Sequence, residues 1–60
     1  MSPELEAKII FSIKRLRELM EEGSISDNEY RRLLWNYTSK LQSLMDQETF
    51  EQLLQKAFHE

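Results

Sequence analysis

The sequence predicts an all-α fold, in which an antiparallel helical hairpin and a short third helix form a three-helix bundle. In three segments the apolar residues recur every three or four positions, as on one face of a helix. The single glycine separates the first segment from the second, and the apolar stripe of the third segment is out of phase with that of the second. We therefore expect one domain, residues 1–60, with helices at about 3–22, 27–45 and 47–58.

The first helix begins at Ser2, which can act as an N-cap. Pro3 follows in the first turn, where no N–H is needed, and Glu4 lies near the positive end of the helix dipole. At about 100° per residue, one stripe collects the following residues: Leu5, Ile9, Ile13, Leu16 and Met20, with Leu19 at its edge. The helix is expected to end at Gly23, where a left-handed C-terminal cap requires glycine.

The second helix begins with a capping box formed by Ser26 and Glu29. Ile25 and Tyr30 occupy the two positions of a hydrophobic staple around this box. The stripe of this helix comprises Tyr30, Leu33, Leu34, Tyr37, Leu41, Leu44 and Met45. Because the loop before it is only about three residues long, the two helices are expected to lie antiparallel.

A third stripe follows without an intervening glycine or proline. Its members are Phe50, Leu53, Leu54, Ala57 and Phe58. One alternative is an unbroken helix from Asp27 onward, whose far end packs on a second subunit. In such a helix the third stripe would lie almost opposite the second, so we expect a break near Asp46, which can cap a separate third helix that folds back on the hairpin.

The segment Ile13–Leu34 resembles the short C-terminal domain, SHOCT, a bacterial and phage module. The pattern of that family is an amphipathic run, then Gly-x-Ile-Ser/Thr, two residues, and Glu followed by an aromatic residue. Here those places are held by Gly23, Ile25, Ser26, Glu29 and Tyr30. The resemblance implies a hairpin that oligomerises or binds a partner and that has no catalytic activity.

Composition excludes several classes of site. A chain of 60 residues buries only about 60% of its unfolded surface, so we expect a homodimer or a partner. There is no cysteine, and His59 is the only histidine, so we expect no zinc or thiolate site and no cofactor. No apolar run approaches the ~20 residues that span a bilayer, and the acidic opening is unlike a signal peptide. We expect a cytoplasmic protein without a membrane segment.

Catalytic constellations are absent from the sequence. Glu21 and Glu22 are adjacent, so on a helix they point about 100° apart and do not converge as an acid and a base. Ser24 and Ser26 have no histidine or lysine in the same loop, and Ser26 already serves as a cap. We expect a protein that is not an enzyme.

Three apolar residues are not explained by the stripes and are candidate partner-binding residues: Phe11, Ile10 and Trp35. Phe11 lies nearly opposite the first stripe, where it either covers the third helix, rests on lysine and arginine stems, or contacts another chain. Ile10 flanks it and would enlarge the same patch. Trp35 either packs against the third helix, within the monomer or across a dimer, or is a binding hot spot.

Five basic residues are predicted to gather at one height of the hairpin: Lys14, Arg15, Arg17, Arg31 and Arg32. Such a cluster can bind phosphates, although acidic residues lie near it and the net charge is -3. Two hypotheses result. The first is a small regulator that docks an apolar helical face on a protein partner, by occlusion or bridging, and the alternative is a nucleic-acid-associated regulator that uses the basic patch.

Overall fold

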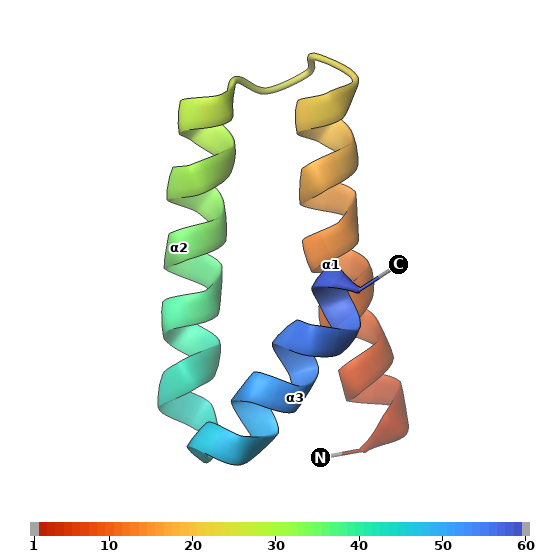
Figure 1. The fold of residues 1–60 in the computed structure, drawn as a ribbon, viewed down its shortest axis with the longest axis vertical. Coiled ribbons are helices and arrows are strands. Elements are labelled where there is room, and N and C mark those ends of the chain that lie inside the picture. The colour runs from red at the N-terminus through yellow and green to blue at the C-terminus, as the bar shows by residue number, and fades with distance from the viewer. Residues whose placement is uncertain (1, 60) are drawn as a thin grey trace.

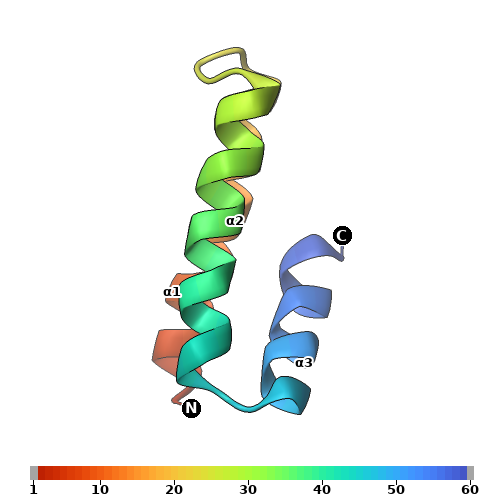
Figure 2. The same ribbon diagram turned by 90° about the vertical axis from the view of Figure 1, so that its left-hand side faces the viewer.

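Three helices make up the computed structural model, which describes residues 2–59. Helix α1 spans Pro3–Glu21, α2 spans Asp27–Leu44 and α3 spans Gln47–Phe58. Helices α1 and α2 lie side by side and antiparallel, and α3 folds back over the half of this hairpin that is farthest from its loop (Figures 1 and 2). The predicted all-α hairpin with a short third helix is confirmed. The first two helices each end one residue earlier than predicted.

The chain leaves α1 through a glycine-dependent cap. Gly23 has φ +83°, and its N–H donates to the carbonyl oxygen of Met20 at 3.0 Å. The N–H of Ser24 donates to the carbonyl oxygen of Leu19 at 2.9 Å. These two bonds form a Schellman motif, which satisfies carbonyl groups that have no partner at the end of a helix.

The capping box that opens α2 is present as predicted. The N–H of Glu29 donates to Ser26 Oγ at 3.1 Å, and the N–H of Ser26 donates to Glu29 Oε1 at 3.3 Å. The reciprocal pair fixes the direction in which the chain enters α2. Because only a short loop separates it from the Schellman motif, α2 must return along α1.

Helices α2 and α3 are separate, so the alternative of one unbroken helix from Asp27 onward is wrong. Met45 (φ −143°, ψ 165°) and Asp46 (φ −72°, ψ 162°) are both extended, which interrupts the helical backbone. Asp46 then caps α3, since its Oδ1 accepts the N–H of Thr49 at 2.7 Å. The change of direction lets the third stripe face the hairpin.

The core lies where α3 covers the hairpin. Ile13 is completely buried, and the other buried residues are Ile9, Leu41, Phe50, Leu53 and Ala57. Lys56 Nζ, near the end of α3, pairs with Glu6 Oε1 of α1 at 2.6 Å. None of residues 14–40 is buried, so the half of the hairpin nearest the loop contributes no fully enclosed side chain.

Four residues that the stripes place in the core are instead substantially exposed: Leu5 (50%), Leu33 (38%), Leu44 (80%) and Phe58 (41%). Leu5, Leu44 and Phe58 lie in the first or last turn of their helices, where neighbouring atoms surround them incompletely. Leu33 lies in the first half of α2, near the loop, within the stretch of residues 14–40 in which no side chain is buried. A position in an apolar stripe is therefore not sufficient for burial in this chain.

We expect Gly23→Ala to destabilise the protein by about 1 kcal/mol, because an L side chain at φ +83° is strained. The matched control is Gly23→Asn, since asparagine tolerates the left-handed conformation better, and it should lose less. Chemical unfolding followed by helical circular dichroism measures both. Equal stability of the alanine variant and the wild type would contradict this account of the cap.

A second expectation concerns pH. The hydrogen bond from the backbone N–H of Thr49 lowers the pKa of Asp46 below its usual value of 3.8. The ionised cap therefore stabilises the fold above that usual value, and the contribution is lost as the pH falls through the lower folded pKa. The melting temperature of the wild type should fall more steeply with acid than that of Asp46→Asn, which keeps a capping oxygen but does not titrate. Parallel pH profiles would refute the assignment.

Candidate functional site

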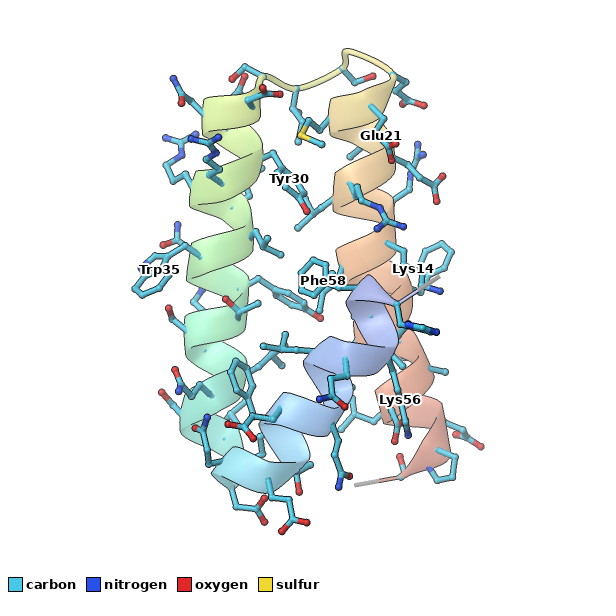
Figure 3. All side chains as sticks on the ribbon, in the orientation of Figure 1. Lys14, Glu21, Tyr30, Trp35, Lys56 and Phe58 are labelled. Carbon is cyan, nitrogen blue, oxygen red and sulfur yellow. The ribbon has the colours of Figure 1, made fainter. Side chains whose placement is uncertain are left out.

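Trp35 is the most exposed aromatic side chain for which the structure gives a value. It is 72% exposed and points away from both α1 and α3 (Figure 3). Successive residues on a helix differ by about 100°, so Trp35 is turned away from the core-facing direction of Leu34. The interpretation that Trp35 packs against the third helix within the monomer is therefore wrong. Its contact across a dimer or with another partner stays a prediction.

Phe11 is also at the surface, with 68% of its area exposed. It lines a shallow hollow on α1 together with Ala7, Lys8 and Ser12. Lys14, one turn further along, points away from α2 (Figure 3), so Phe11 lies at the edge of the hairpin opposite Trp35. The interpretation that Phe11 covers the third helix is wrong.

Ile10 does not enlarge the exposed patch of Phe11 as predicted. It is half-buried and packs against the core cluster. The reason is its phase, because Ile10 lies one helical turn before the completely buried Ile13 and shares its side of α1. Phe11 is therefore the exposed member of this pair, and Ile10 serves the fold.

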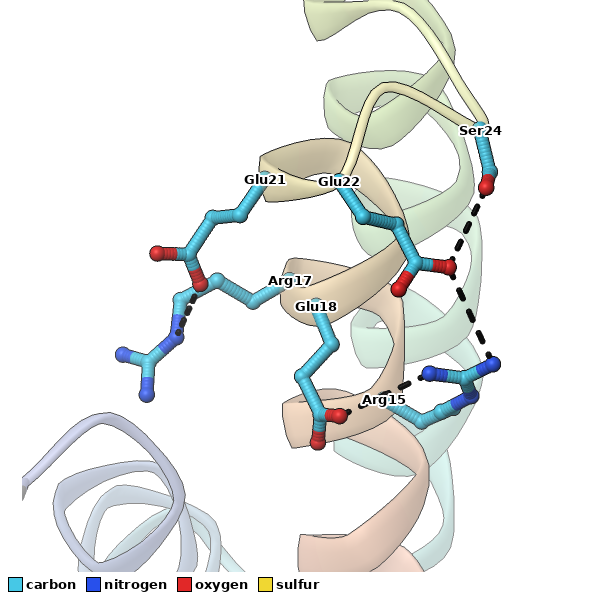
Figure 4. A network of polar contacts seen from close by, with 6 residues as sticks. All are labelled: Arg15, Arg17, Glu18, Glu21, Glu22 and Ser24. Carbon is cyan, nitrogen blue, oxygen red and sulfur yellow. Dashed lines mark hydrogen bonds and ion pairs between the residues drawn. The ribbon is translucent and has the colours of Figure 1, made fainter.

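The two arginines of α1 are paired with acidic neighbours and do not form one patch. Arg15 Nη1 pairs with Glu18 Oε2 at 3.5 Å, and Arg15 Nη2 lies 3.9 Å from Glu22 Oε1. Arg17 Nε lies 3.7 Å from Glu21 Oε1. Figure 4 shows Arg15 and Arg17 directed to different sides of α1. These ion pairs offset much of the positive charge that a phosphate would meet.

The two arginines of α2 are in a different position. Arg31 and Arg32 are exposed, lie about one turn before Trp35, and make no ion pair among the described residues. The antiparallel hairpin holds the five basic residues at a similar height, but they do not form one patch, because Arg15 and Arg17 point to different sides of α1 and Lys14 lies at its far edge (Figures 3 and 4).

The structure also has an apolar hollow that sequence reasoning did not identify. It lies at the open end of the hairpin, and its volume is ≈ 620 Å³. Its lining residues are Leu5, Ile9, Tyr37, Leu41, Leu44, Met45, Asp46 and Thr49. The sequence did contain a signal for this hollow. Leu5 lies near the start of the first stripe and Leu44 near the end of the second, and antiparallel helices bring these two ends side by side.

Within residues 2–59, no group of three or more histidine, cysteine, aspartate or glutamate side chains is placed to hold a metal ion. Across the same residues, none of the helices combines the length and the apolarity needed to cross a membrane. The lowered pKa of Asp46 is explained by its capping bond.

No family model, no curated protein and no solved structure matches this chain. The resemblance of residues 13–34 to the short C-terminal domain therefore stays a prediction.

The exposed aromatic residues are expected to be unnecessary for folding, and two phenylalanines test this. Phe50→Ala removes a side chain that is 7% exposed and should cost about 3 kcal/mol, whereas Phe11→Ala should stay within about 0.5 kcal/mol of the wild type. Urea unfolding of the two variants compares the same chemical change at two levels of burial. A loss above about 1 kcal/mol for Phe11→Ala would show that Phe11 belongs to the fold.

Proposed function

We propose that this chain is a small, non-enzymatic protein-interaction module that regulates a partner protein by docking exposed aromatic side chains on it. One observation carries the proposal. Trp35 and Phe11 are 72% and 68% exposed, although the same chain buries Phe50 and five other apolar residues. Large aromatic side chains are enriched in the buried centres of protein interfaces and dominate their binding energy.

The placement of the two residues favours bridging over occlusion. Trp35 lies on the edge of α2 that faces away from α1 (Figure 3). Phe11, one turn before Lys14, is placed by helical spacing on the edge of α1 that faces away from α2. A single flat partner surface does not reach both edges of a helical hairpin, whose two helices together are about 20 Å wide. Each aromatic residue therefore anchors its own contact, and the module joins two surfaces. The setting we propose for this action is the cytoplasm.

The alternative function, nucleic-acid binding, is supported by a narrower observation. Arg31 and Arg32 are exposed beside Trp35, and an aromatic ring next to cations can stack on a base while the cations contact phosphates. Against it, Arg15 is paired with Glu18 and Glu22, and the net charge of the chain is -3. Protein docking is accordingly the first proposal.

Trp35 is the only tryptophan, so its fluorescence reports directly on docking at this edge. A partner protein is first captured from host extract on the wild type and purified. We expect its binding to shift the emission of Trp35 to shorter wavelength, and we expect Trp35→Ala to bind this partner at least about tenfold more weakly. Phe11→Ala should weaken capture of a protein at the other edge. Asn36→Ala, an exposed neighbour of Trp35, is the matched control and should bind like the wild type.

Salt separates the two functions. Docking through aromatic anchors should survive roughly 0.5 M salt, whereas binding to DNA or RNA should weaken steeply with salt and should disappear in Arg31→Glu with Arg32→Glu. If capture is unchanged in both Trp35→Ala and Phe11→Ala, the docking proposal fails. Retention of an oligonucleotide that depends on the two arginines would favour the alternative.

A further inference from the structure

The apolar stripes of α1 and α2 continue beyond the point where α3 stops covering them. Leu16 and Met20 follow the buried Ile13 at helical spacing on α1, and Tyr30 precedes the buried Leu41 on α2, one turn beyond Leu34, which still packs against the core. We call three residues the uncovered stripe: Leu16, Met20 and Tyr30. All three are half-buried, although their phase is that of the core.

The length of α3 explains why the stripe is uncovered. Its 12 residues extend about 18 Å, whereas the 18 and 19 residues of α2 and α1 extend about 27 Å and 28 Å. Figures 1 and 2 show that α3 ends beside the middle of the hairpin. Phe58 at this end and Tyr30 both lie toward the space between α1 and α2 (Figure 3). Above that point the hairpin is a layer of only two helices.

Two measures of shape agree with an incompletely covered hairpin. The accessible surface is 4602 Å², whereas a compact monomer of 7.3 kDa is expected to expose roughly 4,200 Å². The radius of gyration is 11.7 Å, against roughly 10.4 Å for 60 residues. A second layer of helices over the half of the hairpin nearest the loop would bury this excess surface.

Charge along the hairpin is arranged in bands. From residue 18 to residue 29 the chain has only acidic charges, and we call this region the acidic tip: Glu18, Glu21, Glu22, Asp27 and Glu29. Residues 7–17 and 30–45 have only basic charges and form the basic waist: Lys8, Lys14, Arg15, Arg17, Arg31, Arg32 and Lys40. Because α1 and α2 are antiparallel, the tip is at the loop and the waist lies directly below it on both helices (Figure 1).

We propose that a second copy of this chain covers the uncovered stripe, antiparallel to the first and related by a two-fold axis. The apolar faces of the two hairpins then form four packed helices, with one α3 beyond each end of the contact. Charge selects the orientation. An antiparallel arrangement lays each acidic tip over the basic waist of the other copy, whereas a parallel one places tip against tip.

One ion pair follows from this symmetry. Lys14 and Glu21 are two turns apart and face the same side of α1 (Figure 3). An axis midway between them brings Lys14 of each copy to Glu21 of the other. Lys14 makes no ion pair among the described residues, and the side chain of Glu21, which contacts Arg17, remains 64% exposed. Both charges are therefore accessible.

This surface is distinct from the aromatic anchors. Trp35 points away from the space between α1 and α2 (Figure 3). Phe11 is 68% exposed and lies nearly opposite the stripe of α1 by helical spacing, so dimerisation leaves both exposed. A dimer consequently presents each anchor twice, and a partner with two sites would bind it with a raised effective concentration. The dimer does not depend on the proposed docking function, and either can fail without the other.

Sedimentation velocity of the full chain over micromolar to millimolar concentration tests the proposal. We expect the wild type to pass from 7.3 kDa to twice that mass, and Met20→Glu, which places a charge in the stripe, to remain monomeric at concentrations at which the wild type is dimeric. The matched control, Ser43→Glu, adds the same charge at an exposed position near the end of α2, outside the interface, and should dimerise like the wild type. Helical circular dichroism confirms that each variant is folded.

Charge exchange tests the antiparallel orientation even if Met20→Glu unfolds. Lys14→Glu and Glu21→Lys should each raise the dimer dissociation constant about tenfold, because each occurs twice per dimer, and the double variant should recover to within about threefold of the wild type. The emission of Trp35 should not shift on dimerisation. A wild type that stays monomeric at every concentration, a dimer indifferent to these changes, a double variant that does not recover, or a blue shift of Trp35 would each overturn the proposal.

Discussion

The packing of α3 on Ile13 is the interaction on which the rest of this structure depends. Ile13 is completely buried, and three of the other five buried residues, Phe50, Leu53 and Ala57, come from α3. A hairpin of two helices has no enclosed interior of its own, so α3 is needed to remove Ile13 from water. That packing in turn requires the extended backbone at Met45 and Asp46, since an unbroken helix would carry the third stripe away from the hairpin.

The same constraint produces the surfaces available for contact. Because α3 is shorter than the helices that it covers, one half of the hairpin holds the core and the other half holds no buried side chain. Apolar residues in the second half, such as Met20 and Tyr30, have the phase of the core but not its burial. One half of the hairpin is therefore covered by α3, whereas the apolar face of the other half remains available for contact with another chain. The length of α3 determines the boundary between the two halves.

Local signals in the sequence predicted the secondary structure closely, because each has a short-range physical cause. Gly23 alone can adopt φ +83° without strain, Ser26 and Glu29 satisfy each other's backbone groups, and Asp46 accepts the N–H of Thr49. The phase of Phe50 and Leu53 indicated the break before α3. Burial was predicted less well, because periodicity gives the direction of a side chain around its helix and not the extent to which a neighbour covers it. Leu44 belongs to the apolar stripe of the second helix and is still 80% exposed.

The candidate site illustrates the same difference between direction and neighbourhood. Trp35 and Phe11 lie outside the stripes, which was visible in the sequence, but whether another helix covers them depends on where α3 crosses, which no local pattern encodes. Arg15 was assigned to a basic patch because of its height on α1. Sequence spacing allows it to pair with Glu18 and Glu22, but the side-chain conformations that form these pairs are seen only in the structure. Phe11 and Phe50 are the same residue type, yet Phe11 is 68% exposed and Phe50 is 7% exposed. The contact surface of this molecule is thus defined by what the short third helix leaves uncovered, and residues become candidates for recognition because the fold does not use them.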